Sequence, residues 1–160
     1  MSEVYDKPLD EISDADLNKL PGQPFRERLK DQVVDVGFSQ FNDSHNKLMD
    51  LILDADVLFD LMLVTGNTAK YWGRLEEIVD DLVTYTKQHF AEEEEFLISR
   101  QHAKINEHTA QHSRLVEELN DFQKSVTSQN EDIIQMRKWL LEWLLVHVNT
   151  HDLSYKELAS

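Results

Sequence analysis

Apolar residues recur every three or four positions over most of the chain from residue 43 onward, with charged and polar residues between them. This spacing places the apolar side chains along one face of an α-helix. The pattern predicts four helices, over residues 43–66, 68–99, 105–126 and 133–151. Because the connections between them are short, we expect an all-α fold in which the helices form an antiparallel up-and-down four-helix bundle.

Residues 1–36 follow a different pattern. They hold all three prolines, Pro8, Pro21 and Pro24, among charged residues and show no sustained helical period. Proline interrupts a helix because it lacks the backbone N–H and clashes with the preceding turn. We therefore expect an N-terminal arm over residues 1–36 with one short helix, lying over a bundle domain of residues 37–160.

Composition and charge narrow the functional classes. A chain of 160 residues with 41% hydrophobic residues fits one domain with its own core. The formal net charge of -15 disfavours a nucleic-acid partner, since phosphate binding depends on clustered Lys and Arg. The chain has no apolar run of about 18 residues and does not begin with a basic segment followed by an apolar one. We expect no membrane insertion and a cytoplasmic location.

Histidine positions carry the strongest chemical signal. Six of the seven histidines fall on the apolar helix faces: His45, His89, His108, His112, His147 and His151. A buried imidazole is costly unless its ring nitrogens find partners, and a single one is more often a hydrogen-bonded core residue than a metal ligand. Six histidines on apolar faces together favour the interpretation that they bind metal.

The spacing of these residues explains how they would meet. Glu93 follows His89 by four positions, and His112 follows His108 by four, so each pair shares one helix face. In an antiparallel bundle the two pairs lie at the same level across a short turn. Two metal ions would satisfy the imidazoles and balance the carboxylate charge. With no cysteine in the chain, ligands are limited to nitrogen and oxygen, which suits iron, manganese or zinc.

Three motifs lie at these positions: His89-Phe-Ala-Glu-Glu93, His108-Thr-Ala-Gln-His112 and His147-Val-Asn-Thr-His-Asp152, preceded by Asn42-Asp-Ser-His45. Together they resemble hemerythrins, and bacteriohemerythrins in particular, over about residues 36–158. The resemblance implies two non-haem iron ions bridged by an oxo or hydroxo group and by carboxylates, with dioxygen binding reversibly at an open position of one iron.

The resemblance also implies a role for each ligand. His108, His112 and His147 would bind one iron, His45 and His89 the other, and Glu93 and Asp152 would bridge them. The dry lining around the open iron would consist of Leu48, Phe90, Trp143 and Leu144. These four also fit an ordinary bundle core, which requires the same burial.

One ligand position conflicts with regular helix geometry. Five residues along an ideal helix turn by about 140°, so Asp152 lies off the face of His147 whereas His151 lies on it. Spacing alone selects His151, and the family pattern selects Asp152. A widened helical turn near the site would reconcile the two, and such turns are frequent at functional sites.

Two classes of function remain open. The resemblance implies an oxygen-binding protein rather than an enzyme, serving storage, sensing or delivery to an oxygen-using enzyme as partner. The alternative is a di-iron oxidase, a peroxide or nitric oxide reductase, or an iron-donating repair protein on the same bundle. Ferritin-like di-iron enzymes carry glutamates on each helix with Glu-x-x-His pairs, and no such pair occupies the matching positions here. In the run of residues 92–95 only Glu93 has the required offset from His89, so the other three glutamates are expected to be solvated.

Overall fold

The computed structural model describes residues 5–32, 37–128 and 132–146, without the side chains of Leu144 and Val146. Every regular element within these ranges is helical, which confirms the all-α prediction. The elements, in chain order, are η2 (Leu9–Glu11), α1 (Asp14–Leu17), α2 (Gln23–Lys30), α3 (Ser39–Thr65), α4 (Thr68–Ser99), α5 (Ile105–Thr127) and α6 (Ile133–Val146).

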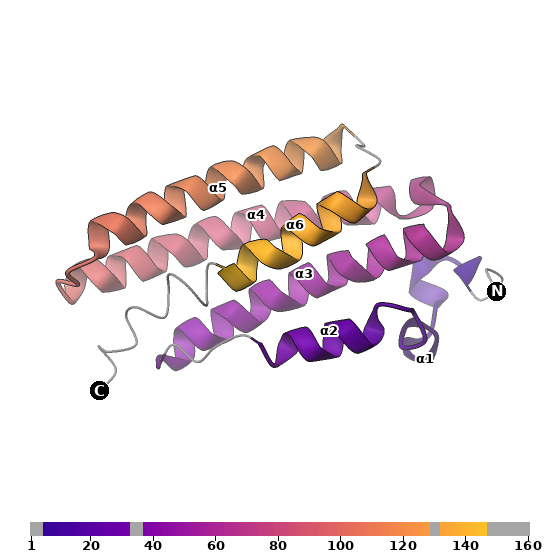
Figure 1. Cartoon of the computed structure of the whole chain (residues 1–160), viewed down its shortest axis with the longest axis horizontal. Helices are drawn as coiled ribbons and strands as arrows, with labels where there is room; N and C mark the ends of the chain where they lie inside the picture. The colour runs from indigo at the N-terminus through magenta and orange to yellow at the C-terminus, as the bar shows by residue number, and fades with distance from the viewer. Residues whose placement is uncertain (1–4, 33–36, 129–131, 147–160) are drawn as a thin grey trace.

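The four long helices, α3 to α6, alternate in direction and lie side by side as a bundle (Figure 1). Helix α4 packs against α3 on one side and α5 on the other, and α6 packs against α3. The expected up-and-down order is therefore the one observed. Among the described residues, no helix is both long enough and apolar enough to cross a membrane.

The turn between α3 and α4 contains two residues that mark the boundary of these helices in the sequence. Gly66 closes α3 with a φ of 67°, the left-handed conformation that glycine adopts without a steric penalty. Asn67 then caps α4, its side-chain oxygen accepting a hydrogen bond from the backbone N–H of Lys70 at 3.3 Å. Two residues thus reverse the chain.

Helices α3 and α6 can be compared with the predicted first and fourth helices at their ends. Helix α3 begins at Ser39, one turn before the predicted start at residue 43, because Phe41 is buried and extends the apolar face. The predicted fourth helix reached residue 151. Its described part ends at Val146, and residues 147–160 lie outside the described part of the chain.

Indole N–H groups connect the helices across the core. Trp72 on α4 donates to the carbonyl oxygen of Val126 at 2.7 Å, and Trp143 on α6 donates to that of Leu115 at 3.3 Å. A buried indole needs such a partner, and here each bond joins a second helix to α5. The largest fully buried side chains are Tyr71, Phe41, Phe59, Leu20, Leu48, Ile52, Leu61, Met62, Leu75, Leu82 and Leu97.

Residues 5–32, the described part of the N-terminal arm, form three short helical elements, so the expectation of one short helix was wrong. Ser13 caps α1, its hydroxyl oxygen accepting from the N–H of Asp16 at 3.2 Å. Pro24 lies in the first turn of α2, where backbone N–H groups have no acceptor within the helix, so the missing N–H of proline costs no hydrogen bond. Pro8 and Pro24 therefore lie at the starts of helices, where proline is compatible with helical structure.

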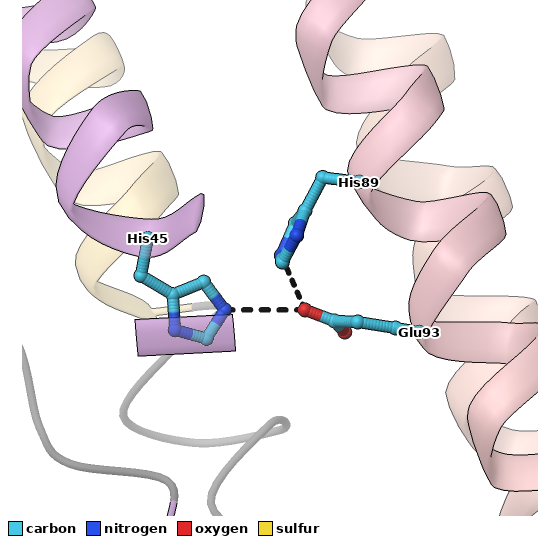
Figure 2. A group of neighbouring side chains, drawn as sticks. All are labelled: His45, His89 and Glu93. Atoms are coloured by element: carbon cyan, nitrogen blue, oxygen red, sulfur yellow. Dashed lines mark hydrogen bonds and ion pairs between the residues drawn. The ribbon is translucent and has the colours of Figure 1, made fainter. Parts of the chain in front are cut away.

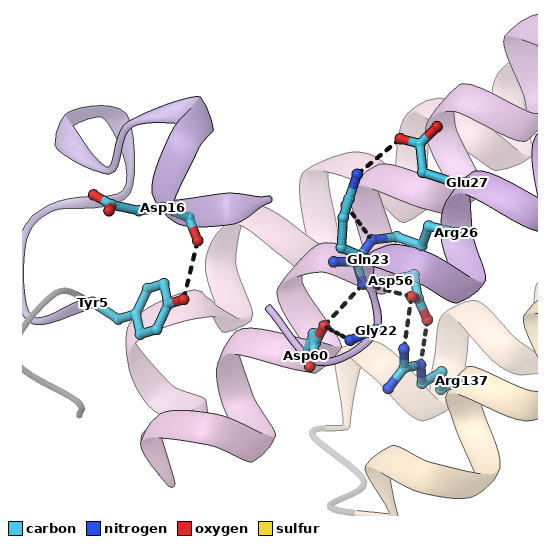
Figure 3. A network of polar contacts seen from close by, with 9 residues as sticks. All are labelled: Tyr5, Asp16, Gly22, Gln23, Arg26, Glu27, Asp56, Asp60 and Arg137. Atoms are coloured by element: carbon cyan, nitrogen blue, oxygen red, sulfur yellow. Dashed lines mark hydrogen bonds and ion pairs between the residues drawn. The ribbon is translucent and has the colours of Figure 1, made fainter. Parts of the chain in front are cut away.

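A buried charge network joins the arm to the bundle (Figure 3). Nη1 of Arg26, on α2, lies 2.9 Å from Oδ2 of Asp56 and 3.0 Å from Oδ2 of Asp60, both on α3. Nη2 of Arg137, on α6, donates to Oδ2 of Asp56 at 2.9 Å, and the N–H of Gly22 donates to Oδ2 of Asp60 at 2.8 Å. We call Arg26, Asp56, Asp60 and Arg137 the arm network.

We expect Arg26→Ala to lower the free energy of unfolding by about 3–5 kcal/mol, because it leaves Asp60 buried without its cationic partner. Urea unfolding followed by circular dichroism measures this. Arg74→Ala is the matched control, since Arg74 pairs with Glu77 at the surface and such pairs contribute about 1 kcal/mol or less. Equal losses in the two variants would show that the arm network does not anchor the arm.

Candidate metal centre

Three helices bring the candidate ligands to one level. His45 lies about 30 Å along α3 from the Gly66 turn, and His89 lies about 31 Å along α4 from the same turn, so the two face each other. The turn between α4 and α5 is short, so His108 and His112 near the start of α5 lie opposite the last turns of α4. Helix lengths and turn lengths therefore decide which residues meet.

The carboxylate of Glu93 lies at the middle of these imidazoles. Oε1 lies 3.1 Å from Nε2 of His45 and is also in close contact with Nε2 of His89 (Figure 2). Oε2 lies 3.5 Å from Nε2 of His108 and 3.3 Å from Nε2 of His112. Each oxygen thus faces a different pair of imidazoles. We call these five residues the histidine–glutamate cluster.

The cluster lies in the interior of the bundle. Its side chains are at most 3% exposed, and those of His45, His89 and Glu93 are 0% exposed. A carboxylate and four imidazoles removed from water carry a large desolvation cost unless charge and hydrogen bonds compensate it.

The donor set fits two metal ions. One group of donor atoms comes from His45, His89 and Glu93, the other from Glu93, His108 and His112, and within each group the atoms lie within 4.8 Å of one another. Within the described part of the chain, Nδ1 of His89 is buried and makes no hydrogen bond, and the buried Nε2 lies against Oε1 of Glu93. A cation on Nε2 would remove part of that cost, and imidazole nitrogen with carboxylate oxygen is a donor set that iron and zinc accept.

The residues predicted to line the oxygen pocket are buried where they are described. Phe90 stacks on His112 with ring centroids 3.9 Å apart and an interplanar angle of 2°. The ring of Trp143 lies 6.4 Å from that of Phe90, and Leu48 is fully buried on α3. The side chain of Leu144 lies outside the described part. Burial agrees with a pocket and with ordinary core alike, so the pocket assignment stays a prediction.

Sequence reasoning missed an aromatic cap made by Phe38, Phe41 and Phe96. The ring of Phe96 lies 4.7 Å from that of Phe38 and 5.2 Å from that of Phe41, which in turn lies 6.3 Å from the imidazole of His89. The three rings therefore pack together, and Phe41 brings them into contact with His89. The available signal was the four-residue step from Phe41 to His45.

His147, His151 and Asp152 lie outside the described residues, so the choice between His151 and Asp152 stays open. His102, by contrast, is described and takes no part in the cluster. Its Nδ1 accepts a hydrogen bond from the N–H of Lys104 at 3.0 Å, in the turn before α5.

Comparison with known proteins agrees with this arrangement. The family model of the hemerythrin HHE cation binding domain matches residues 36–159. A bacteriohemerythrin of Clostridium acetobutylicum is 24% identical over 123 residues, covering 76% of this chain and 92% of the relative, and one of Methylococcus capsulatus is 27% identical, covering 76% and 86%. A myohemerythrin of Theromyzon tessulatum is 34% identical over 80 residues, covering 50% and 62%. No solved structure matches significantly.

The helical bundle and its buried histidine–glutamate cluster define a metal-binding four-helix protein. Because the family model covers most of the chain, the protein belongs to the hemerythrin family, whose defining unit is the HHE cation-binding domain. Cation binding is therefore the family property that this site would serve.

We expect metal to stabilise the fold, because a ligand that binds only the native state adds about 2.7 kcal/mol at 100 times its dissociation constant. Thermal unfolding of the metal-free protein with and without excess zinc measures the gain. His89→Ala removes one donor and should reduce the gain, whereas His102→Ala, which changes a histidine outside the cluster, should keep it. If zinc stabilises the His89→Ala protein as strongly as the wild type, His89 is not a ligand.

Proposed function

We propose that this protein binds dioxygen reversibly at a non-haem di-iron centre, for oxygen storage, delivery to an oxygen-using enzyme, or sensing. The observation that carries the proposal is the position of Glu93, whose two carboxylate oxygens each face a separate pair of imidazoles. A carboxylate shared in this way suits a pair of metal ions rather than one.

The proposed ligands follow the family motifs. His45 and His89 would hold one iron, His108, His112 and His147 the other, and Glu93 and Asp152 would bridge them. Membership of the hemerythrin family supports this assignment. When bound, the iron pair supplies the electrons that reversible dioxygen binding requires.

The protein's own part is to position these donors and to keep water away. Helices α3, α4 and α5 hold the imidazoles and Glu93 so that the donor atoms of each group lie within 4.8 Å of one another. Phe90 places apolar surface against His112, and Leu48, Trp143 and Leu144 are the further proposed members of the lining. A dry site limits proton delivery, and slow proton delivery favours release of dioxygen unchanged.

The first test is an optical spectrum of the reduced, iron-loaded protein, recorded without air, after exposure to oxygen, and after purging. We expect two irons per chain and a charge-transfer band that forms with oxygen and fades on purging. Continuous oxygen consumption with an electron donor would instead indicate the di-iron oxidase or reductase alternative. A protein that holds no iron would contradict the proposal at its basis.

We expect Leu48→Ala to accelerate autoxidation of the oxygenated protein, because the cavity left by the side chain admits water to the lining. Loss of the oxygenated spectrum with time measures the rate. Leu75→Ala is the matched control, since Leu75 is equally buried on α4 but lies about 21 Å along that helix from His89. Both variants should lose about 2–5 kcal/mol of stability. Equal autoxidation in the two would assign Leu48 to the core rather than to a protective lining.

A further inference from the structure

His112 has a carboxylate at each end of its ring. Nε2 lies 3.3 Å from Oε2 of Glu93 inside the cluster, while Nδ1 lies 3.2 Å from Oε1 of Glu94 on the outer side. The side chain of Glu94 is 28% exposed, so it lies at the edge of the buried cluster rather than in open solvent. Consecutive glutamates thus contact opposite nitrogens of one imidazole.

The partner on the outer nitrogen decides which tautomer a neutral histidine adopts. A carboxylate accepts a hydrogen bond from Nδ1–H and leaves the Nε2 lone pair available for a metal. The same contact increases the basicity of the ligand, and Phe90 stacked on the ring restricts its rotation. His112 is therefore oriented to bind a metal ion through the lone pair of Nε2.

His89 has no such support. Its Nδ1 is buried and makes no hydrogen bond within the described part of the chain. Both His89 and His112 face Glu93, but only His112 is shown with a carboxylate behind it. His89 and His112 therefore differ in a property that governs metal affinity.

We propose that Glu94 is a positioning residue for the metal centre: it holds His112 with the proton on Nδ1 and gives the His108–His112 half of the site the higher metal affinity. This inference rests on the proposed metal site and extends it to a residue outside the ligand set. Glu94 binds no metal in this account, and it acts through His112.

The neighbouring glutamates provide a matched comparison within one run of four. Glu92 is exposed and accepts a hydrogen bond from Nε2 of Gln88 at 3.2 Å, one turn earlier on the same helix. Glu95 is likewise exposed. Replacing Glu92 removes the same charge, likewise one residue from Glu93 along the helix, while leaving the contact to His112 in place.

The test is a zinc titration of the full-length metal-free protein, with histidine ¹⁵N spectra recorded at each step. The spectra identify the histidines that bind at each step and report the tautomer of His112 before metal is added. We expect the wild-type His108–His112 half to bind first, with His112 carrying its proton on Nδ1.

In Glu94→Ala we expect the affinity of that half to fall about 10- to 100-fold, the range typical for loss of a hydrogen-bond partner behind a metal-binding histidine. The metal-free spectrum should also show mixed tautomers of His112. Glu94→Gln should recover part of the affinity, because its amide oxygen still accepts the hydrogen bond but carries no charge. Glu92→Ala should behave as the wild type.

Separate results would overturn the two proposals. If the wild type binds zinc through the clustered histidines but Glu94→Ala and Glu92→Ala bind it equally well, Glu94 has no positioning role and the metal site stands. A wild-type His112 with its proton on Nε2 would also refute the positioning role. If the clustered histidines of the wild type bind neither zinc nor iron, the metal site itself fails, and the inference fails with it.

Discussion

The carboxylate of Glu93 is the constraint on which the rest of the site depends. It is fully buried, and its two oxygens face imidazoles from α3, α4 and α5. A buried carboxylate is stable only with compensating charge or hydrogen bonds, so the helices must hold their donors at its level. The two-residue turn after α3 and the short turn after α4 set that level. The packing of the bundle and the positions of the candidate ligands therefore depend on each other.

Two buried ionic clusters lie along α3, and they differ in charge balance. In the arm network two arginines face two aspartates, so the charges are matched within the protein. In the histidine–glutamate cluster four imidazoles surround a single described carboxylate, an arrangement suited to receiving cations. The first cluster accounts for how the arm is fastened to α3 and α6. The second has a donor set that could hold metal ions, which agrees with membership of the hemerythrin family.

The cluster has aromatic side chains around it and one partly exposed carboxylate, Glu94, at its edge. Phe41 packs against Phe96 and His89, and Phe90 lies flat against His112. Behind His112, Glu94 is partly exposed and within hydrogen-bonding distance of Nδ1. An apolar wall excludes water, while a carboxylate at the rim orients a ligand without entering the site. In the proposed function these two features serve oxygen release and metal affinity respectively.

The sequence by itself determined the four long helices, because their periods and the Gly66–Asn67 turn are local signals. It also identified His89 with Glu93 and His108 with His112, since a four-residue step places two donors on one face. Only the tertiary structure decided the contacts that no local period encodes. Arg26 meets Asp60 across 34 positions, and Arg137 meets Asp56 across 81. Likewise, the sequence does not distinguish Glu94 from its exposed neighbours Glu92 and Glu95. In the structure Glu94 contacts the imidazole of His112 on α5, and such a contact depends on which helix packs against this face.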